Sequence, residues 1–223
     1  MQTREVARLI DHTILKADAT PSDIAKLCRE ANQYGFAAVC VNASYIPLVK
    51  SIVHDEILIA SVVGFPLGAT STYSKCQETK QAIADGASEI DMVINIGWAK
   101  AGLWPEVEAD IRAVVLAAGP VGVKVILETA LLNDEEKTAV CTLSKRAGAA
   151  FVKTSTGFSV SGATLPDVAL MRRTVGPDVG VKASGGVRNL AILMDFVAAG
   201  ANRIGTSSGV AIVEESQAQN ATT

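Results

Sequence analysis

The chain has 223 residues, of which 49% are hydrophobic and 19% are charged, and its mean hydropathy is +0.30. This composition excludes a disordered chain, and because no apolar run reaches the roughly 18 residues of a membrane span, we expect no membrane partner. The net charge of −3 and an aromatic content of 4% are atypical of a nucleic-acid-binding surface, so we expect no nucleic-acid partner.

The four cysteines are widely spaced and form no CxxC pair, which is typical of reduced thiols. The first residues contain no apolar signal-sequence core. Both observations favour a cytoplasmic protein.

A short apolar run, a longer amphipathic stretch and a glycine-marked turn recur along the chain. The apolar runs predict eight strands, at 9–15, 36–42, 58–65, 89–95, 122–129, 151–155, 179–184 and 202–206. Most are nearly continuous in apolar residues, which is typical of parallel strands covered by helices. Capping residues and glycines predict helices between them, among them 20–35, 70–86, 133–148 and 189–200.

Eight strand–helix alternations without a linker predict an α/β protein with a single closed (β/α)₈ TIM barrel, forming one domain over residues 1–223. A doubly wound open sheet is the alternative, disfavoured because no GxGxxG follows the first strand. Residues before Leu9 predict a short extra N-terminal helix that could cap the barrel floor. The polar residues from Ser216 to Thr223 predict a frayed tail.

Three lysines, Lys124, Lys153 and Lys182, each follow a valine in an apolar strand and are separated by 29 residues. This spacing predicts comparable heights on three successive strands, near the barrel mouth. Because burial and a neighbouring ammonium both lower a lysine pKa, the pattern favours the central Lys153 as a neutral nucleophile that forms a Schiff base. The alternative is that all three belong to structural ion pairs, and Lys124 could equally support a phosphate.

Asp91 shares a pleat phase with Glu89, Val93 and Asn95, so these side chains can face the barrel interior. An inward carboxylate near lysines can move a proton or orient a water. The alternative is a salt bridge that only neutralises a lysine.

Glycines and serines follow the last two predicted strands, Gly185 and Gly186 after one and Ser207 and Ser208 after the other. Loops at these places in a barrel commonly bind phosphate through backbone N–H groups. Thr156 adds a hydroxyl just beyond Lys153.

Other polar residues on the predicted strands are open to two interpretations. His12, after Asp11, and Cys40 could line the lumen or simply fill the core, and Glu128 could order a lysine. There is no HExxH motif and no Cys/His cluster with metal-ligand spacing, so we expect no metal.

Together these motifs resemble the deoxyribose-phosphate aldolase family. FVKTSTG (151–157) resembles its Schiff-base motif, and VKASGGVR (181–188) resembles its second-lysine and phosphate-loop motif. The similarity extends from about Leu9 to Gly209, almost the whole chain.

The resemblance implies a class I aldolase that reversibly cleaves 2-deoxy-D-ribose 5-phosphate to D-glyceraldehyde 3-phosphate and acetaldehyde without a cofactor. It implies that Lys153 forms the imine, that Lys182 perturbs its pKa and shares in proton transfer, and that Asp91 moves protons through a water. The residues it implies for substrate binding are Lys124, Thr156, Gly185, Gly186, Ser207, Ser208, Cys40 and Asp11.

The chain departs from some family members, which end in a tyrosine and carry a lysine where this chain has Phe158; phosphate binding would then rest more on Arg188 and Lys124. The apolar fraction and family habit predict a homo-oligomer, a dimer or tetramer. The competing functions are a metal-dependent phosphosugar epimerase, a non-catalytic phosphate-binding barrel and a transaldolase-like enzyme.

Overall fold

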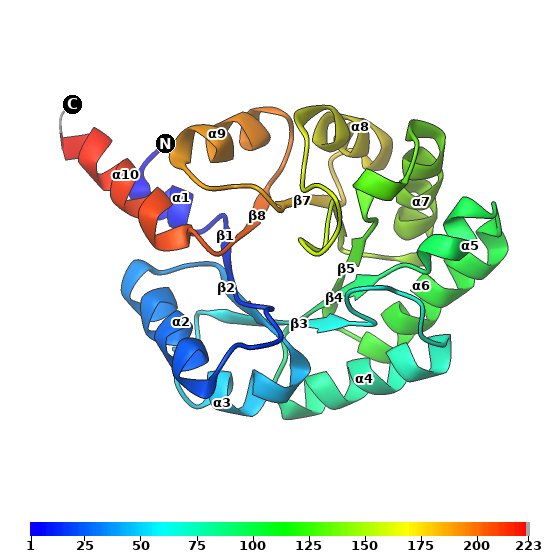
Figure 1. Cartoon of the computed structure of the whole chain (residues 1–223), viewed down its shortest axis with the longest axis horizontal. Helices are drawn as coiled ribbons and strands as arrows, with labels where there is room; N and C mark the ends of the chain where they lie inside the picture. Colours follow the sequence, from blue (N-terminus) through cyan, green and yellow to red (C-terminus); the bar gives the residue numbers. More distant parts are fainter. Residues whose placement is uncertain (222–223) are drawn as a thin grey trace.

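The computed structural model describes residues 1–221, and in them eight parallel strands close into a barrel in chain order, with helices around it (Figure 1). The strands are β1 (Ile10–Thr13), β2 (Ala38–Val41), β3 (Leu58–Val63), β4 (Glu89–Val93), β5 (Gly122–Ile126), β6 (Phe151–Lys153), β7 (Gly180–Ser184) and β8 (Arg203–Thr206). The predicted (β/α)₈ TIM barrel is confirmed, and each predicted strand contains one observed strand. Several predicted strands extended beyond the carboxyl end of the observed strand, because buried residues such as Leu127 and Ser155 continue into the loops.

The helices follow the strands around the outside of the barrel. They are α1 (Thr3–Ala7), α2 (Pro21–Tyr34), α3 (Ile46–Lys50), α4 (Thr72–Asp85), α5 (Ile96–Lys100), α6 (Trp104–Ala118), α7 (Asp134–Ala147), α8 (Leu165–Val175), α9 (Leu190–Ala198) and α10 (Gly209–Ala221). Two 3₁₀ turns, η1 (Ala43–Tyr45) and η2 (Thr129–Leu131), complete the elements of residues 1–221. None of these helices is long and apolar enough to cross a membrane.

Local sequence signals set the helix ends. Thr20 caps α2 by accepting a hydrogen bond from the Asp23 N–H, and the Asp23 carboxylate accepts from the Thr20 N–H in return. The helix ends where Gly35 adopts a left-handed φ of 68°, a conformation that costs glycine little. Asn133 and Gly148 bound α7 in the same way. The short α3 and α5 were not predicted, since five residues are too few to show a helical period.

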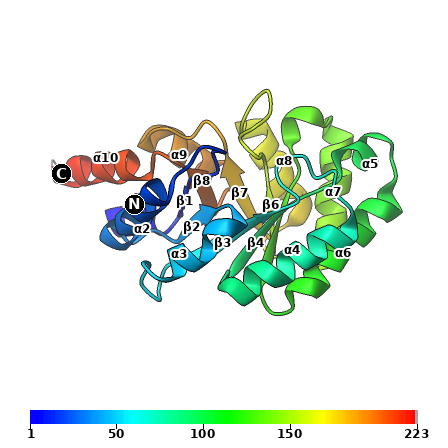
Figure 2. The same ribbon diagram turned by 60° about the horizontal axis from the view of Figure 1, so that its bottom comes forward.

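The two ends of the described chain pack against each other (Figure 2). The hydroxyl of Thr3 in α1 lies 2.9 Å from the Asn220 amide nitrogen and 3.2 Å from the Ser216 hydroxyl, both in α10. The predicted floor cap is therefore wrong, because α1 lies beside α10 outside the strands (Figure 1). The predicted frayed tail is also wrong as far as Ala221, and Thr222 and Thr223 lie outside the described residues.

The strands are buried on both faces, but the two faces differ in chemistry. Their outward side chains join the apolar core beneath the helices, while the inward ones include many buried charges. At the amino-terminal end of the barrel, the floor, the ring of Phe151 packs against Gly180. A Cβ on Gly180 would lie 2.1 Å from the ring, so only glycine leaves room for Phe151 there.

Candidate active site

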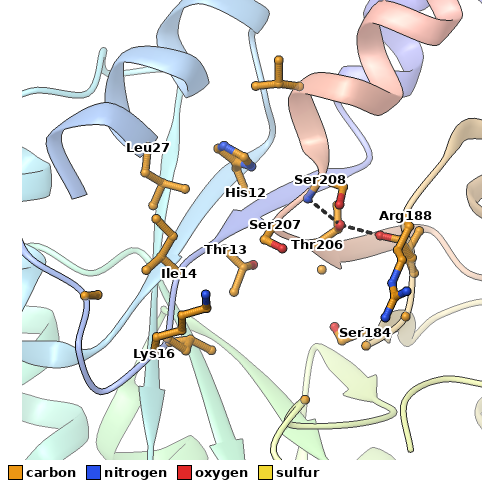
Figure 3. A pocket seen from close by; sticks show the side chains of 18 of the residues that line it. His12, Thr13, Ile14, Lys16, Leu27, Ser184, Arg188, Thr206, Ser207 and Ser208 are labelled. Carbon is orange, nitrogen blue, oxygen red and sulfur yellow. Dashed lines mark hydrogen bonds between the residues drawn. The ribbon is translucent and has the colours of Figure 1, made fainter. Parts of the chain in front are cut away.

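A cavity of about 1070 Å³ opens at the carboxyl ends of the strands. It is lined by the loops after β1, β6, β7 and β8, by α2 and by the start of α10. Figure 3 shows side chains of β1, among them His12 and Thr13, facing Ser184 at the end of β7 and Ser207 in the loop after β8. This end of a (β/α)₈ barrel is where such enzymes place their catalytic groups.

Beneath the cavity, charged side chains from six strands meet inside the barrel in what we call the lumen cluster. Its members are Asp11, Glu89, Asp91, Lys124, Lys153, Lys182 and Arg203. Strand register brings them together, because paired residues of neighbouring strands point to the same face. Asp91 pairs with Lys124, and Lys153 with Lys182, which in turn pairs with Arg203.

The Asp91 carboxylate is the centre of the lumen cluster. One oxygen accepts a hydrogen bond from Lys124 at 2.8 Å, and the other accepts from Lys153 and Lys182, both at 2.8 Å. Burial alone would raise the pKa of Asp91, but the three ammonium groups together hold it well below its usual range. Asp91 is therefore a carboxylate at neutral pH.

Two further carboxylates form ion pairs in the lumen cluster. Asp11 accepts hydrogen bonds from Lys182 and, at 2.7 Å, from Arg203, and Glu89 accepts from Lys124 at 2.6 Å and from Arg203 at 3.0 Å. Although burial would raise it, the pKa of Asp11 is lowered to about 2 by Lys182, Lys124 and Arg203.

The same carboxylates act on two of the lysines. Burial by itself would lower the pKa values of Lys124 and Lys182, but Asp91 and Asp11 raise both above the ordinary value. Lys124 and Lys182 therefore remain protonated cations.

Lys153 differs from the other two lysines in its access to the cavity. Its ammonium group pairs with Asp91, and among the lumen cluster's members Lys153 alone lines the cavity. Lys124 and Lys182 are fully buried below it. The predicted position near the barrel mouth is thus right for Lys153 and wrong for the other two.

Backbone N–H groups gather at the other side of the cavity. Gly185 and Gly186 both adopt left-handed φ values, 87° and 86°, a backbone conformation that favours glycine. The Thr206 hydroxyl accepts from the Ser208 N–H at 2.9 Å and donates to the Val187 carbonyl at 2.6 Å, which ties the β7 and β8 loops together (Figure 3). Because α10 begins directly after Ser208, its positive end also faces this region.

Glu128 fixes the loop after β6. It has a left-handed φ of 59°, rare for a residue other than glycine, and its buried carboxylate accepts hydrogen bonds from the Thr156 N–H and hydroxyl. The Thr156 hydroxyl in turn accepts from the Phe158 N–H at 3.0 Å. The interpretation that Glu128 orders a lysine is wrong; it orders the loop that lines the cavity beside Lys153.

Comparison with known proteins agrees with this arrangement. Residues 5–215 match the family described as DeoC/LacD family aldolase. The chain belongs to this aldolase family. It is 56% identical to the deoxyribose-phosphate aldolase of Geobacillus sp. (strain WCH70) over 94% of this chain and 95% of that protein. It is 54% identical to that of Coprothermobacter proteolyticus over 95% and 97% of the two chains.

A solved structure is also similar. The deoxyribose phosphate aldolase from Aeropyrum pernix, described as a tetramer, has a TM-score of 0.89 and 34% identity, over 98% of this chain and 93% of that one. The predicted family is therefore confirmed, and the protein is an aldolase, a carbon–carbon lyase.

The predicted site residues of this aldolase fall into two groups. Those that line the cavity are Lys153, Thr156, Gly185, Gly186, Ser207 and Ser208. Asp91 and Lys182 lie directly below the cavity. Asp91 contacts Lys153, and Lys182 contacts Asp91. Lys124, Asp11 and Cys40 are fully buried and do not line the cavity, so their predicted contact with substrate is not found here.

Other residues of the site were missed from the sequence. Lys16 lines the cavity, and so does His12, for which the sequence left a place in the site and a place in the core both open; His12 hydrogen-bonds Glu30 at 2.8 Å while packing on Phe36. Arg203 was also missed, although a charge at the start of a buried strand was a usable signal. The partners of Arg203 are distant in sequence, which hid its role.

We predict that Asp11→Asn weakens the fold at neutral pH and reduces its loss of stability in acid. The folded pKa of Asp11 is depressed from 3.8 to about 2, so its contribution is present above about pH 4 and is lost as pH falls towards 2. The shift corresponds to about 2 kcal/mol, and the variant also leaves Lys182 and Arg203 with one partner fewer. Urea unfolding at pH 7 should therefore show a loss of about 2–4 kcal/mol.

The same titration carried from pH 7 to pH 3 should show a shallower decline for Asp11→Asn than for the unmodified protein. Asp178→Asn, at an exposed position, is the matched control and should change stability by less than about 0.5 kcal/mol. Equal pH slopes for Asp11→Asn and the unmodified protein would contradict the assigned pKa shift.

Proposed function

We propose that this aldolase reversibly cleaves 2-deoxy-D-ribose 5-phosphate to D-glyceraldehyde 3-phosphate and acetaldehyde, through a Schiff base on Lys153. The observation that carries the proposal is the position of Lys153: it lines the cavity while its ammonium group lies 2.8 Å from the Asp91 carboxylate. The relatives named deoxyribose-phosphate aldolase support the substrate.

The reaction begins when the neutral Lys153 amine attacks C1 of the open-chain aldehyde. The carbinolamine loses water to give a protonated imine. The C3 hydroxyl then gives up its proton, the C2–C3 bond breaks, and its electron pair moves through C2–C1 to the imine nitrogen. D-Glyceraldehyde 3-phosphate leaves, the enamine takes a proton at C2, and hydrolysis of the imine releases acetaldehyde.

The ionisation states of the neighbours support separate roles for them in the proton transfers. Asp91 has a depressed pKa and is a carboxylate, so it acts through a water as proton acceptor at the C3 hydroxyl. Lys182 has a raised pKa and remains a cation, so it stabilises negative charge and donates hydrogen bonds through the same network. Their shared hydrogen bond at 2.8 Å keeps donor and acceptor together.

The far side of the cavity suits the phosphate. The consecutive left-handed glycines Gly185 and Gly186, the serines before α10 and the side chain of Arg188 all line it. Several N–H donors and one guanidinium match the charge and the acceptor oxygens of a phosphate monoester. Lys124, buried among carboxylates, takes no part in holding it.

The nucleophile can be tested by borohydride trapping. After incubation with acetaldehyde and sodium borohydride, peptide mass spectrometry should find a two-carbon adduct on Lys153. Lys153→Arg keeps a cation beside Asp91 and should fold, but it should lose at least about 10³-fold in turnover, since a guanidinium does not form the imine. Labelling of Lys182 instead would move the nucleophile, and no labelling of a folded protein would reject the mechanism.

The phosphate site can be tested with Arg188→Gln. We expect KM for 2-deoxyribose 5-phosphate to rise about tenfold, while kcat/KM for unphosphorylated 2-deoxyribose stays unchanged, because only the first substrate offers the guanidinium a phosphate. Arg173→Gln, at an exposed position of α8 outside the cavity, is the control. An equal loss of kcat/KM with both substrates would show that Arg188 does not bind the phosphate.

We also propose that the enzyme assembles as a dimer or tetramer. Large apolar side chains remain exposed on adjacent helices, among them Tyr73 of α4 and Leu116 of α6, at 74% and 75%. The Aeropyrum pernix relative is described as a tetramer. Sedimentation equilibrium at micromolar concentration should give two or four times the 23.2 kDa chain mass, and a monomer would contradict the proposal.

A further inference from the structure

The proposed mechanism leaves the two lowest members of the lumen cluster without a role. Arg203 is the first residue of β8 and Glu89 the first of β4, so both lie at the floor of the barrel, away from the cavity. Their side chains are only 12% and 11% exposed, and they form a 3.0 Å ion pair. The Arg203 guanidinium also lies 5.5 Å from the centre of the Phe151 ring, in the space that Gly180 leaves.

Two chains of alternating charge lead from this floor pair to Asp91. One runs from Arg203 through Asp11 to Lys182, whose ammonium group lies 2.8 Å from Asp91. The other runs from Glu89 through Lys124, with links of 2.6 and 2.8 Å. Every link is a direct hydrogen bond, and every group except the partly exposed Arg203 is buried, so a change of charge at the floor reaches Asp91 with reduced screening by water.

The charges of the lumen cluster do not cancel. Four cations face three carboxylates, which leaves one positive charge in excess when all are ionised. Lys124 and Lys182 each contact at least two carboxylates, whereas Lys153 contacts one. Loss of a single proton from Lys153 would balance the cluster, and it yields the neutral amine that the nucleophile requires.

We propose that Arg203 and Glu89 are positioning residues of this aldolase, whose opposite charges set the pH at which Lys153 becomes the neutral nucleophile. They act through Asp11 and Lys124 and touch neither substrate nor reacting atoms. The inference rests on the proposed function of Lys153, and it adds that the charge at the barrel floor tunes that function.

The other groups around Lys153 are known strand by strand. Asp11 of β1, Asp91 of β4, Lys124 of β5 and Lys182 of β7 are charged, and β2 contributes Cys40, whose thiol stays neutral because burial raises its pKa. The lumen residues Ala60 and Val62 of β3 carry no charge. On the cavity side the charged or titratable residues that line the cavity are His12, Lys16, Asp18, Asp23, Lys26, Glu30, Arg188 and Glu214. None of these changes in the variants below.

The test uses two charge-neutralising variants that predict opposite shifts. Glu89→Gln removes a negative charge, so Lys153 loses its proton more easily and the rising limb of the kcat/KM–pH profile moves down. Arg203→Gln removes a positive charge and moves the rising limb to higher pH. Along the register Lys153–Lys182–Arg203, two strand spacings separate the backbones by roughly 10 Å, so the shift for Arg203→Gln should be about one pH unit at an effective dielectric constant near 20. Glu89 lies four residues before Val93 in the register Lys153–Ile126–Val93 and is therefore more distant, so the shift for Glu89→Gln should be smaller.

The pH dependence of borohydride trapping on Lys153 should shift in the same two directions, which separates ionisation of the amine from later steps. The double variant Glu89→Gln with Arg203→Gln restores the charge and should return the profile close to that of the unmodified enzyme. Arg203→Lys keeps the charge and should also leave the profile in place. Glu108→Gln and Arg146→Gln, an ion pair on the outer helices α6 and α7, serve as controls without a shift.

The outcomes separate this inference from the function on which it rests. No adduct on Lys153 of the unmodified enzyme would reject the proposed function. A normal adduct, with variant profiles that are unmoved or move in the same direction, would overturn the role of the floor pair alone. If Arg203→Gln does not fold, Glu89→Gln and the double variant decide: a downward shift in the first and its reversal in the second are required.

Discussion

The arrangement of the lumen depends on one carboxylate, that of Asp91, which accepts hydrogen bonds from three ammonium groups at 2.8 Å each. Without it, three lysines on neighbouring strands would repel one another in a space from which water is excluded. Their convergence also requires a closed barrel, because β4, β5, β6 and β7 must curve around a common axis for these side chains to meet. The fold and the charge arrangement therefore depend on each other, because the barrel brings the lysines together and Asp91 offsets the repulsion between them.

The enzyme divides its work between strands and loops. The groups proposed to handle protons are Asp91, Lys153 and Lys182, and they lie on strands fixed by hydrogen bonds on both sides. The groups suited to phosphate lie on loops after β7 and β8, which the Thr206 hydroxyl links through Val187. Proton transfer needs atoms held within a few tenths of an ångström. A phosphate has several equivalent oxygens, so it can be bound with a less exact geometry.

Much of this was visible in the sequence, and the rest was hidden for identifiable reasons. Apolar runs and glycine stops revealed the eight strands, and the pleat phase of Asp91 pointed it inward. The features that were missed depend on contacts between residues distant in sequence. Arg203 contacts Glu89, 114 positions away, and the end of α10 is held by a hydrogen bond between Asn220 and Thr3, 217 positions away. The raised pKa values of Lys124 and Lys182 were not anticipated, because the sequence shows the cationic neighbours but not how closely carboxylates approach them.

Burial of a charge does not by itself identify the active site, as Lys75 demonstrates. It lies in α4, where helical position alone suggests exposure, yet it is fully buried and pairs with Asp110 of α6 at 2.6 Å. Its ammonium group also donates to the carbonyl of Val93 at 2.9 Å, so it fixes the end of the strand that carries Asp91. Lys75 and Lys153 thus share burial and a carboxylate partner, and they differ in access: Lys153 lines the cavity and Lys75 does not. Since a buried ion pair costs about as much in desolvation as it returns, each is retained for the geometry it holds, and only the one with access to the cavity can use that geometry for covalent chemistry.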